Sequence, residues 1–450
     1  MKYRIAHVGA FDFENYGDLL FTDVLERQLK KRIEIEEIVY FAPKSCTMPN
    51  RKEKVYSVVD LEKIVHEKRI DAIVVGGGDL VHLQKIRTYM PHLSEEWVDY
   101  EVLYMWVIPC IIAGKYQIPL IWNAPGVPLT FHEGEKKIVS FLCHAVDYIS
   151  VRDYESQKEL GQAIDTTRIK VVPDTVLSIR ELIVMEELKQ IFQSLNLSLS
   201  EKKYIFFQCN ATLQEKYFEV CAEALLKMKA ETGYEVLLQP IGYALGDEAA
   251  LEAFKKKYPG EFVLPARHYD QYEILSLIAN AAMYIGTSLH GCITSNTYKV
   301  PGIVINVNHF NKTDGFVQLI GRENTCIYSP EQLLSAYHTL EDVPEETIEN
   351  CISEIEDHFD RITEIIVSGQ KLQHETYAKE MAEYIFFNGM LENHIPRLDQ
   401  ELQKMQAKYE EQKQKAQFYE AIYHNVMNST SWKITEPLRK ISSRVKRKGD

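Results

Sequence analysis

Short apolar runs alternate with longer helical segments along most of this chain, and this alternation constrains its fold more than any other feature. The first set of runs is rich in valine, isoleucine and aromatic residues and comprises YRIAHVG, IEEIVYF, DAIVVGGG, PLIWNAPG, DYISVRD and IKVVPD. Nearly continuous apolar strands that alternate with helices are typical of a parallel sheet covered on both faces. The sequence therefore predicts an α/β fold.

A second set of strand-like runs follows a polar, strand-free stretch at residues 180–203. It comprises YIFFQCN, YEVLLQPIG, AAMYIGTS and PGIVINV, with helical segments between them. We therefore predict two Rossmann-like domains, an N-terminal one over residues 1–195 and a C-terminal one over residues 196–345, which carries the GTSLHG motif. Because ligands of such sheets bind beyond the carboxyl ends of the strands, we expect the active site in a cleft between two facing domains.

Two helical segments follow the second domain. In residues 346–390, apolar residues three or four positions apart predict a helix that packs on the globular body. In residues 391–428, a similar spacing with Glu, Lys and Gln in between favours a coiled coil, and with it a homodimer. A solvated single helix is the alternative, because Gln412 and Ala416 interrupt the apolar seam. The other seam residues are Ile395, Leu398, Leu402, Met405, Tyr409, Tyr419, Tyr423 and Val426.

The last segment, residues 429–450, reverses the charge of the chain. The whole sequence has 51 Lys and Arg against 65 Asp and Glu, a formal net charge of −14, which argues against a general nucleic-acid-binding role. The last segment is instead basic, and its charges surround Trp432 and several aliphatic residues. Such a tail suits peripheral contact with an anionic membrane surface, and a frayed soluble terminus explains it equally well.

The sequence indicates neither secretion nor a disulfide-stabilised fold. Its start, MKYRIAHVGAF, lacks the apolar core of a signal peptide. The most apolar stretch, residues 102–114, is shorter than the ~18 residues of a membrane span. The 8 cysteines are scattered without CxxC spacing, which argues against a zinc site. We therefore expect a cytoplasmic protein with reduced thiols and no metal, which the basic tail could bring to the inner face of the membrane.

Glycine-rich turns follow two of the predicted N-terminal strands. The segment GAFDFENYGDLLF leads into a helix whose N-terminal amides can bind an anion. The segment VVGGGDLVH has three consecutive glycines, more than a turn requires, so we favour ligand binding over a plain loop. The candidate ligand-binding residues of these turns are Asn15, Gly17, Asp18, Gly77, Gly78 and Asp79.

Two further residues stand at predicted strand ends. Arg152, in YISVRDYES, ends a buried strand, where a guanidinium is costly unless it meets an anion or an internal partner such as Asp153. His290 lies where MYIGTSLHG turns from strand to helix, between Gly286 and Gly291. A buried histidine is usually structural, but this one stands at the ligand-facing end of a strand. An imidazole that titrates near neutrality in a cleft is a natural general acid or base, so His290 is the candidate catalytic residue.

The order and spacing of five segments resemble the polysaccharide pyruvyl transferase family. These segments are NYGDLL, DAIVVGGGDL, SVRDYES, VVPDTVL and YIGTSLHGCITSNTYKVPGIVINVNHFNKTDGF, and the resemblance covers about residues 3–330. It implies a glycosyltransferase-B-like fold with two facing Rossmann-like domains. It also implies an enzyme of exopolysaccharide, capsule or cell-wall synthesis. Such an enzyme transfers the enolpyruvyl unit of phosphoenolpyruvate to hydroxyls of a saccharide or lipid-linked glycan, usually as a ketal.

The resemblance also implies roles for individual residues. The catalytic histidine of the family corresponds to His290, which would donate or relay a proton to the methylene carbon of the donor. Arg152 and Lys312 would hold the carboxylate and the phosphate of phosphoenolpyruvate, and the implied chemistry uses neither a metal nor a cofactor. The glycines and the acid of the first-domain loop correspond to Gly77, Gly78 and Asp79.

At one position the chain departs from the family pattern. Ser288 stands where the family commonly has an arginine, two residues before the histidine. Arg267, in LPARHYD, is the nearest candidate to replace that cation, and we expect phosphoenolpyruvate still to bind. Two other functions stay open at this point. One is a glycosyltransferase-B-type transferase with a nucleotide sugar or another donor, and the other is a non-catalytic scaffold for glycan assembly.

Overall fold

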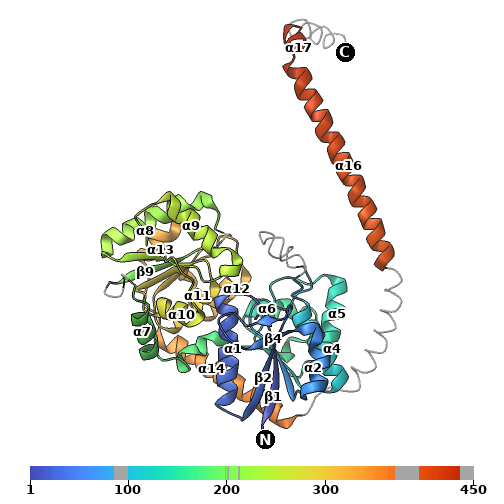
Figure 1. Ribbon diagram of the computed structural model, residues 1–450, viewed down its shortest axis with the longest axis vertical. Coiled ribbons are helices and arrows are strands. Elements are labelled where there is room, and N and C mark those ends of the chain that lie inside the picture. The colour runs from blue at the N-terminus through green and yellow to red at the C-terminus, as the bar shows by residue number, and fades with distance from the viewer. Residues whose placement is uncertain (86–99, 198, 200–201, 211–212, 370–394, 436–450) are drawn as a thin grey trace. The chain divides into compact units, whose positions relative to one another are not determined.

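The computed structural model describes residues 1–85, 100–197, 199, 202–210, 213–369 and 395–435 of the chain. These residues fall into two compact units, Met1–Tyr377 and Ala378–Asp450, and each unit is described by itself. The first unit contains a six-stranded sheet and a five-stranded sheet, and helices flank both faces of each (Figure 1). It therefore has the α/β architecture with two large sheets that the alternating sequence pattern predicts.

The six-stranded sheet is built from residues 3–123. Its strand order is β3-β4-β2-β1-β5-β6, and every neighbouring pair is parallel except β3 and β4. Its strands are β1 Tyr3–Val8, β2 Ile35–Ala42, β3 Cys46–Thr47, β4 Lys54–Ser57, β5 Ala72–Gly76 and β6 Leu120–Asn123. The helices and 3₁₀ turns of this half are α1 Tyr16–Lys30, η1 Val58–Asp60, α2 Leu61–Lys68, α4 Tyr104–Tyr116, α5 Glu133–Cys143, α6 Tyr154–Leu160, η3 Thr166–Arg168 and η4 Thr175–Glu181.

Two predicted strands lie outside this sheet. β7 Ile149–Val151 and β8 Ile169–Val171 pair with each other in a separate two-stranded parallel sheet. The pairing of β7 with β6 stops because the next two hydrogen bonds to the β6 segment are made by the Ser150 hydroxyl and not by the Ser150 backbone. This hydroxyl accepts one from the Ala124 amide at 2.9 Å and donates one to the Trp122 carbonyl at 2.6 Å. The prediction that β7 and β8 belong to the N-terminal parallel sheet is therefore wrong, and the short antiparallel edge strand β3 was not among the predicted strands.

The five-stranded sheet is parallel throughout, in the order β10-β9-β11-β12-β13. One face packs against α8 and α13, and the other face packs against α10 and α11. Its strands are β9 Tyr204–Gln208, β10 Glu235–Leu238, β11 Met283–Gly286, β12 Gly302–Ile305 and β13 Cys326–Ile327. The helices and 3₁₀ turns are α7 Met185–Ser194, η5 Glu215–Tyr217, α8 Phe218–Thr232, η6 Tyr243–Leu245, α9 Asp247–Lys257, α10 Gln271–Ala279, α11 Leu289–Thr297, α12 Asn311–Leu319, η7 Glu323–Thr325, η8 Pro330–Gln332 and α13 Leu333–His338.

Helix α14, Glu345–Ser368, follows the second sheet and packs against the N-terminal half. Its His358 makes hydrogen bonds through Nε2 to Asn123 Oδ1 at 2.9 Å and through Nδ1 to the Tyr148 hydroxyl at 3.0 Å. Buried side chains of α14 belong to the same hydrophobic cluster as those of α1, α10 and α11, so the two halves share one core. The buried stripe of α14 consists of Ile348, Ile352, Ile355, Phe359, Ile362 and Ile366, as its spacing predicts.

The described part of the second unit consists of two helices, α16 Ile395–Asn428 and α17 Thr430–Ile434. Ser429 caps α17, because its hydroxyl accepts a hydrogen bond from the Trp432 amide at 3.2 Å. Among the described residues, no helix has both the length and the apolarity needed to cross a bilayer. Two segments lie outside the described residues. They are residues 370–394, which include most of the rest of the predicted packing segment, and residues 436–450 of the basic tail.

We expect Ile355→Ala to destabilise the first unit, because Ile355 is fully buried where α14 joins the two halves. Truncating such a side chain leaves a cavity and lowers the free energy of unfolding by roughly 2–5 kcal/mol. Val367→Ala on the same helix is the matched control, since Val367 is 52% exposed and its truncation should change that free energy by less than about 0.5 kcal/mol. Urea denaturation of both variants measures the difference, and equal losses would show that α14 does not hold the halves together.

Candidate active site

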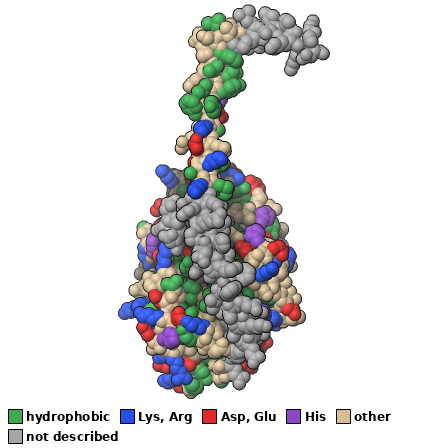
Figure 2. Space-filling view, turned by 90° about the vertical axis from the view of Figure 1, so that its right-hand side faces the viewer, with side chains coloured by type: hydrophobic (Ala, Val, Ile, Leu, Met, Phe, Trp, Pro, Cys, Tyr) green, Lys and Arg blue, Asp and Glu red, His purple; other side chains and the backbone are tan. Residues whose placement is uncertain are grey.

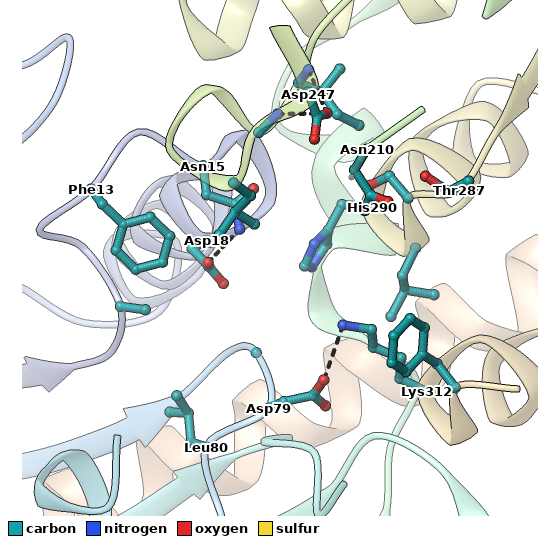
Figure 3. A pocket seen from close by; sticks show the side chains of 18 of the residues that line it. Phe13, Asn15, Asp18, Asp79, Leu80, Asn210, Asp247, Thr287, His290 and Lys312 are labelled. Carbon is teal, nitrogen blue, oxygen red and sulfur yellow. Dashed lines mark hydrogen bonds and ion pairs between the residues drawn. The ribbon is translucent and has the colours of Figure 1, made fainter. Parts of the chain in front are cut away.

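A pocket in the first unit gathers loops that follow strands of both large sheets (Figure 3). Its walls come from the segments after β1, β5 and β9, from the end of β7, and from the first turns of α11 and α12. This is the edge of a parallel sheet at which ligands bind. Of the site residues predicted from the sequence, those that line the pocket are Asn15, Asp18, Gly78, Asp79, Arg152, Ser288, His290 and Lys312.

Asp79 is the centre of a buried ion cluster on one wall of this pocket. The Arg152 guanidinium donates a hydrogen bond to its Oδ1, and Lys312 Nζ lies 3.1 Å from its Oδ2. Arg152 is buried and also lies 3.7 Å from Asp153 and 3.8 Å from Asp174. Charges can be buried here because each has an opposite charge beside it. The cluster joins the two halves, since Arg152 follows β7 and Lys312 lies in α12.

The loop that carries Asp79 needs its glycines for two reasons. Gly77 and Gly78 have φ angles of +87° and +77°, in the left-handed region that favours glycine. A Cβ on Gly77 would also overlap the ring of Phe21 in α1. Gly77 therefore lies behind the pocket and lets α1 pack closely against the loop, while Gly78 lines the pocket itself.

His290 is the second residue of α11, and its imidazole lies against the backbone of Gly17 at the start of α1. Its Nε2 is buried, makes no hydrogen bond to the described residues, and lies 3.8 Å from Asp174 Oδ2. Burial, together with the nearby charges of Arg152 and Lys312, lowers the pKa of His290 to about 3. The sequence predicted an imidazole that titrates near neutrality. In the folded protein, packing and neighbouring cations instead keep it neutral at pH 7.

Asp18 lies across the pocket from His290 (Figure 3). Its side chain is buried, and its Oδ2 accepts a hydrogen bond from Asn15 Nδ2 at 2.6 Å. Burial raises the pKa of Asp18 to about 7, against the opposing effects of the Asn15 hydrogen bond and of Lys312. The environment therefore displaces the pKa values of Asp18 and His290 in opposite directions. Such a pair can divide the roles of acid and base.

Ser288 is the N-cap of α11, and its hydroxyl accepts a hydrogen bond from the Gly291 amide at 3.3 Å. The backbone amides of Thr287 and Ser288 both donate to Gln208 Oε1, each at 3.0 Å. Gln208 Nε2 in turn donates to the buried carboxylate of Asp247 at 2.8 Å. The serine therefore stabilises the start of its own helix, and these two amides have internal partners.

Arg267 does not line the pocket. Its guanidinium donates hydrogen bonds to both carboxylate oxygens of Glu273, at 2.8 and 3.1 Å, and lies 4.1 Å from the centre of the Tyr269 ring. Glu273 is also part of the capping box of α10, so it is fixed in place at that helix start. The expectation that Arg267 compensates for Ser288 is therefore corrected, because local packing holds this arginine elsewhere. Of the described lining residues, the cationic ones are Arg152 and Lys312.

The residues that sequence reasoning missed include two that line the pocket, Gln208 and Asp247, and one that does not line it but lies 3.8 Å from His290 Nε2, Asp174. Asp174 follows β8 in the segment VVPDTVL, Gln208 ends β9, and Asp247 begins α9. The positions of Asp174 and Gln208 after or at the end of a strand could have identified these two residues from the sequence. Asp247 stands nine residues after the end of β10 at Leu238, and nothing in the sequence connects it to Gln208. Within the described parts of the chain, no group of three or more His, Cys, Asp and Glu side chains could hold a metal ion.

Comparisons with known proteins address the family resemblance and the fold. A model of the family described as polysaccharide pyruvyl transferase matches residues 15–309. Among curated proteins, none matches the sequence significantly. The fold is similar to that of UDP-GlcNAc 2-epimerase from Methanocaldococcus jannaschii, with a TM-score of 0.53 at 15% identity over 82% of this chain and 100% of that one. The corresponding enzyme from Rickettsia bellii has a TM-score of 0.51 at 10% identity over 80% and 96% of the two chains. At these identities the likeness shows a glycosyltransferase-B-like fold and nothing finer.

We expect Gly17→Ala to destabilise the protein, because the added Cβ would overlap the His290 imidazole. Over-packing of this kind costs roughly 1–3 kcal/mol, more than the ~1 kcal/mol by which alanine favours a helix over glycine. Gly134→Ala in α5 is the matched control, since a Cβ there has open space, and it should be neutral or stabilising. Denaturant midpoints measure both variants. A Gly17→Ala protein as stable as the control would contradict the close packing of His290 on α1.

Proposed function

The chain belongs to the polysaccharide pyruvyl transferase family and is a transferase, and we propose that it moves the enolpyruvyl unit of phosphoenolpyruvate onto hydroxyls of a bacterial cell-surface glycan. One observation carries this proposal. His290, Arg152 and Lys312, the residues to which the family resemblance gives catalytic and donor-binding roles, all line one pocket. A saccharide or a lipid-linked glycan would be the acceptor, and a pyruvate ketal the product.

The ion cluster supports an anionic donor. Phosphoenolpyruvate carries a carboxylate and a phosphate, and Arg152 and Lys312 could each form a charge-assisted hydrogen bond with one of them. Both cations are paired with Asp79 in the described structure, so donor binding would exchange part of that pairing for the ligand. The exchange replaces one buried ion pair with another and avoids leaving a cation unpaired.

The environment of His290 supports a role in proton transfer. Its Nε2 atom is buried at the pocket and has no hydrogen-bond partner among the described residues. Because the lowered pKa leaves the imidazole neutral at pH 7, Nε2 can accept the proton of an attacking sugar hydroxyl. The gain in positive charge would be favoured by Asp174, whose Oδ2 lies 3.8 Å away.

The alternative donor is a nucleotide sugar. Ser288 in place of the family arginine removes one cation that would favour phosphoenolpyruvate, and the fold is also used by a Neisseria meningitidis UDP-GlcNAc 2-epimerase solved with UDP-GlcNAc, at 11% identity and a TM-score of 0.50. Ligands that bind only the folded state raise its apparent stability, so a thermal-shift titration separates the two donors. Phosphoenolpyruvate should raise the melting temperature and UDP-GlcNAc should not. The reverse result would reject the pyruvyl donor.

We expect His290→Ala to lower the rate of pyruvyl transfer by roughly 10²–10⁴-fold, the usual contribution of a positioned acid or base. The variant should still bind phosphoenolpyruvate, because Arg152 and Lys312 remain. His338→Ala, an exposed histidine of α13, is the matched control and should keep wild-type turnover. Phosphate release measures the rates, and circular dichroism checks the fold. Near wild-type turnover of the His290 variant would make this histidine structural.

We also propose that α16 pairs with a second copy of this chain as a coiled coil. Figure 2 shows hydrophobic side chains on the surface of this helix, and many of them repeat at spacings of three and four residues. Tyr419, for example, is 66% exposed, and burying such side chains against a partner helix is favourable. The exposed seam residues are Leu402, Met405, Tyr409, Tyr419, Tyr423 and Val426.

Light scattering tests this pairing. The full chain should have the mass of a dimer, and a chain that ends near residue 390 should have the mass of a monomer. Tyr423→Lys should weaken the dimer because it places a charge in the seam, whereas Gln414→Lys, outside the seam, should leave it intact. Equal monomer masses for the full and the shortened chain would remove the coiled coil.

A further inference from the structure

Pyruvyl transfer from phosphoenolpyruvate needs an acid as well as a base. The first bond to form joins a proton to the methylene carbon of the donor, and carbon is protonated only by a group that holds a labile proton at the working pH. His290 is a poor candidate, because burial and two neighbouring cations lower its pKa to about 3. Its position in the first turn of α11 acts in the same direction, since the positive end of a helix dipole disfavours imidazolium. The acid must therefore be another group in the pocket.

Asp18 has the right position for this acid. It is the third residue of α1, its side chain is 8% exposed, and its carboxyl group faces the same open space as the imidazole of His290 (Figure 3). It accepts a hydrogen bond from Asn15 and forms no ion pair with any described residue. In contrast, Asp79 is paired with both Arg152 and Lys312. A buried carboxyl group without a cation beside it is the one that most favours its protonated form.

The other charged groups that face Asp18 do not reverse this preference. Lys312 and Arg152 favour the carboxylate, and Asp79 favours the protonated acid. Burial outweighs all of them and raises the pKa of Asp18 to about 7. A substantial fraction of the protein therefore carries a proton at this site at neutral pH. The charged and titratable groups that line the pocket together with Asp18 are Asp79 after β5, Tyr100 before α4, Arg152 after β7, Asp247 at the start of α9, His290 in α11 and Lys312 in α12.

We propose that Asp18 is the general acid that protonates the methylene carbon of phosphoenolpyruvate, and that His290 is the base that receives the proton of the attacking sugar hydroxyl. This assignment rests on the proposed function. It reverses the role implied by the family resemblance, in which His290 supplies the proton.

The two residues close a balanced cycle. In the first half, Asp18 gives its proton to C3, the π electrons of the C2–C3 bond form the new C–H bond, the sugar oxygen bonds to C2, and its proton goes to His290. In the second half, phosphate leaves with the electrons of its bond to C2 and takes the proton from His290. A second sugar hydroxyl then bonds to C2 and returns its proton to Asp18. The sum converts phosphoenolpyruvate and two hydroxyls into a ketal and hydrogen phosphate, and both residues regain their starting states.

Calorimetric titration of phosphoenolpyruvate between pH 7 and 8.5 tests the protonated state of Asp18. Protonated Asp18 adds no charge next to the anionic donor, whereas the ionised carboxylate of Asp18 repels the donor. Wild-type affinity should therefore fall as pH rises through about 7, by roughly tenfold over this range for one linked proton. Asp18→Asn mimics the protonated acid and keeps an acceptor for Asn15, so the affinity of this variant for phosphoenolpyruvate should change by less than about twofold between pH 7 and 8.5. Glu14→Gln, the control, removes a 31% exposed carboxylate from the same loop and should keep the wild-type dependence.

Turnover in D₂O tests the acid role, with a lipid-linked saccharide on which the wild type releases phosphate. Asp18→Asn should lower both phosphate release and deuterium incorporation at the methyl carbon by roughly 10²-fold or more, although it binds the donor. Asp18→Glu restores a carboxyl group and should recover the pH dependence of binding. This variant keeps the inference testable if the Asn variant does not fold.

The outcomes separate this inference from the proposed function. A wild type that binds no phosphoenolpyruvate at any pH overturns the proposed function, and the assignment of Asp18 falls with it. A wild type that binds the donor while Asp18→Asn keeps its turnover overturns the assignment of Asp18 alone. The assignment of Asp18 also falls if Asp18→Asn keeps the wild-type pH dependence of phosphoenolpyruvate binding. If the Asn variant does not fold, absence of this pH dependence in Asp18→Glu overturns the assignment instead.

Discussion

The close approach of the first turn of α1 to the first turn of α11 is the contact on which the pocket depends. Gly17 permits it, because the imidazole of His290 occupies the space that a side chain would need. Two hydrogen bonds of Tyr16 fix the same contact, one between its hydroxyl and that of Thr294 at 2.7 Å and one from its amide to the Ile241 carbonyl at 3.0 Å. Both partners belong to the C-terminal half. One short segment of α1 thus seats His290 and presents Asp18 to the same cavity.

The charges of the pocket form a second constraint. Asp79, Asp153 and Asp174 surround Arg152, so this cation is fully compensated before any ligand arrives. Burial raises the pKa of Asp174 to about 6, against the effect of Arg152. A site with more carboxyl groups than cations can accept an anionic donor only if some of them are protonated or exchange their partners. Donor binding and proton uptake are therefore expected to be coupled in this fold.

Much of the architecture follows from local sequence signals, but the electrostatics do not. The alternation of apolar runs predicts two sheets, and their strand ends correctly indicate where His290 and Arg152 lie, because carboxyl-end loops of parallel strands converge. The break at β7 depends on a hydroxyl of Ser150 that competes with the strand pairing. The lowered pKa of His290 and the position of Arg267 depend on residues that are distant in sequence or on the packing of α10. Such effects arise only when the elements have assembled.

The serine at position 288 fits the same electrostatic account. Its hydroxyl caps α11, and the amides of Thr287 and Ser288 are bound to Gln208, so this helix start offers the donor less than an arginine would. Under the proposed function, recognition of the two anionic groups of phosphoenolpyruvate would then fall to Arg152 and Lys312. A proton on Asp18 removes one negative charge from the pocket, and this changes the net charge by the same amount as adding one arginine. Protonation of a buried acid can therefore replace a missing cation, and under the proposed assignment of Asp18 it would also place the proton where the chemistry needs it.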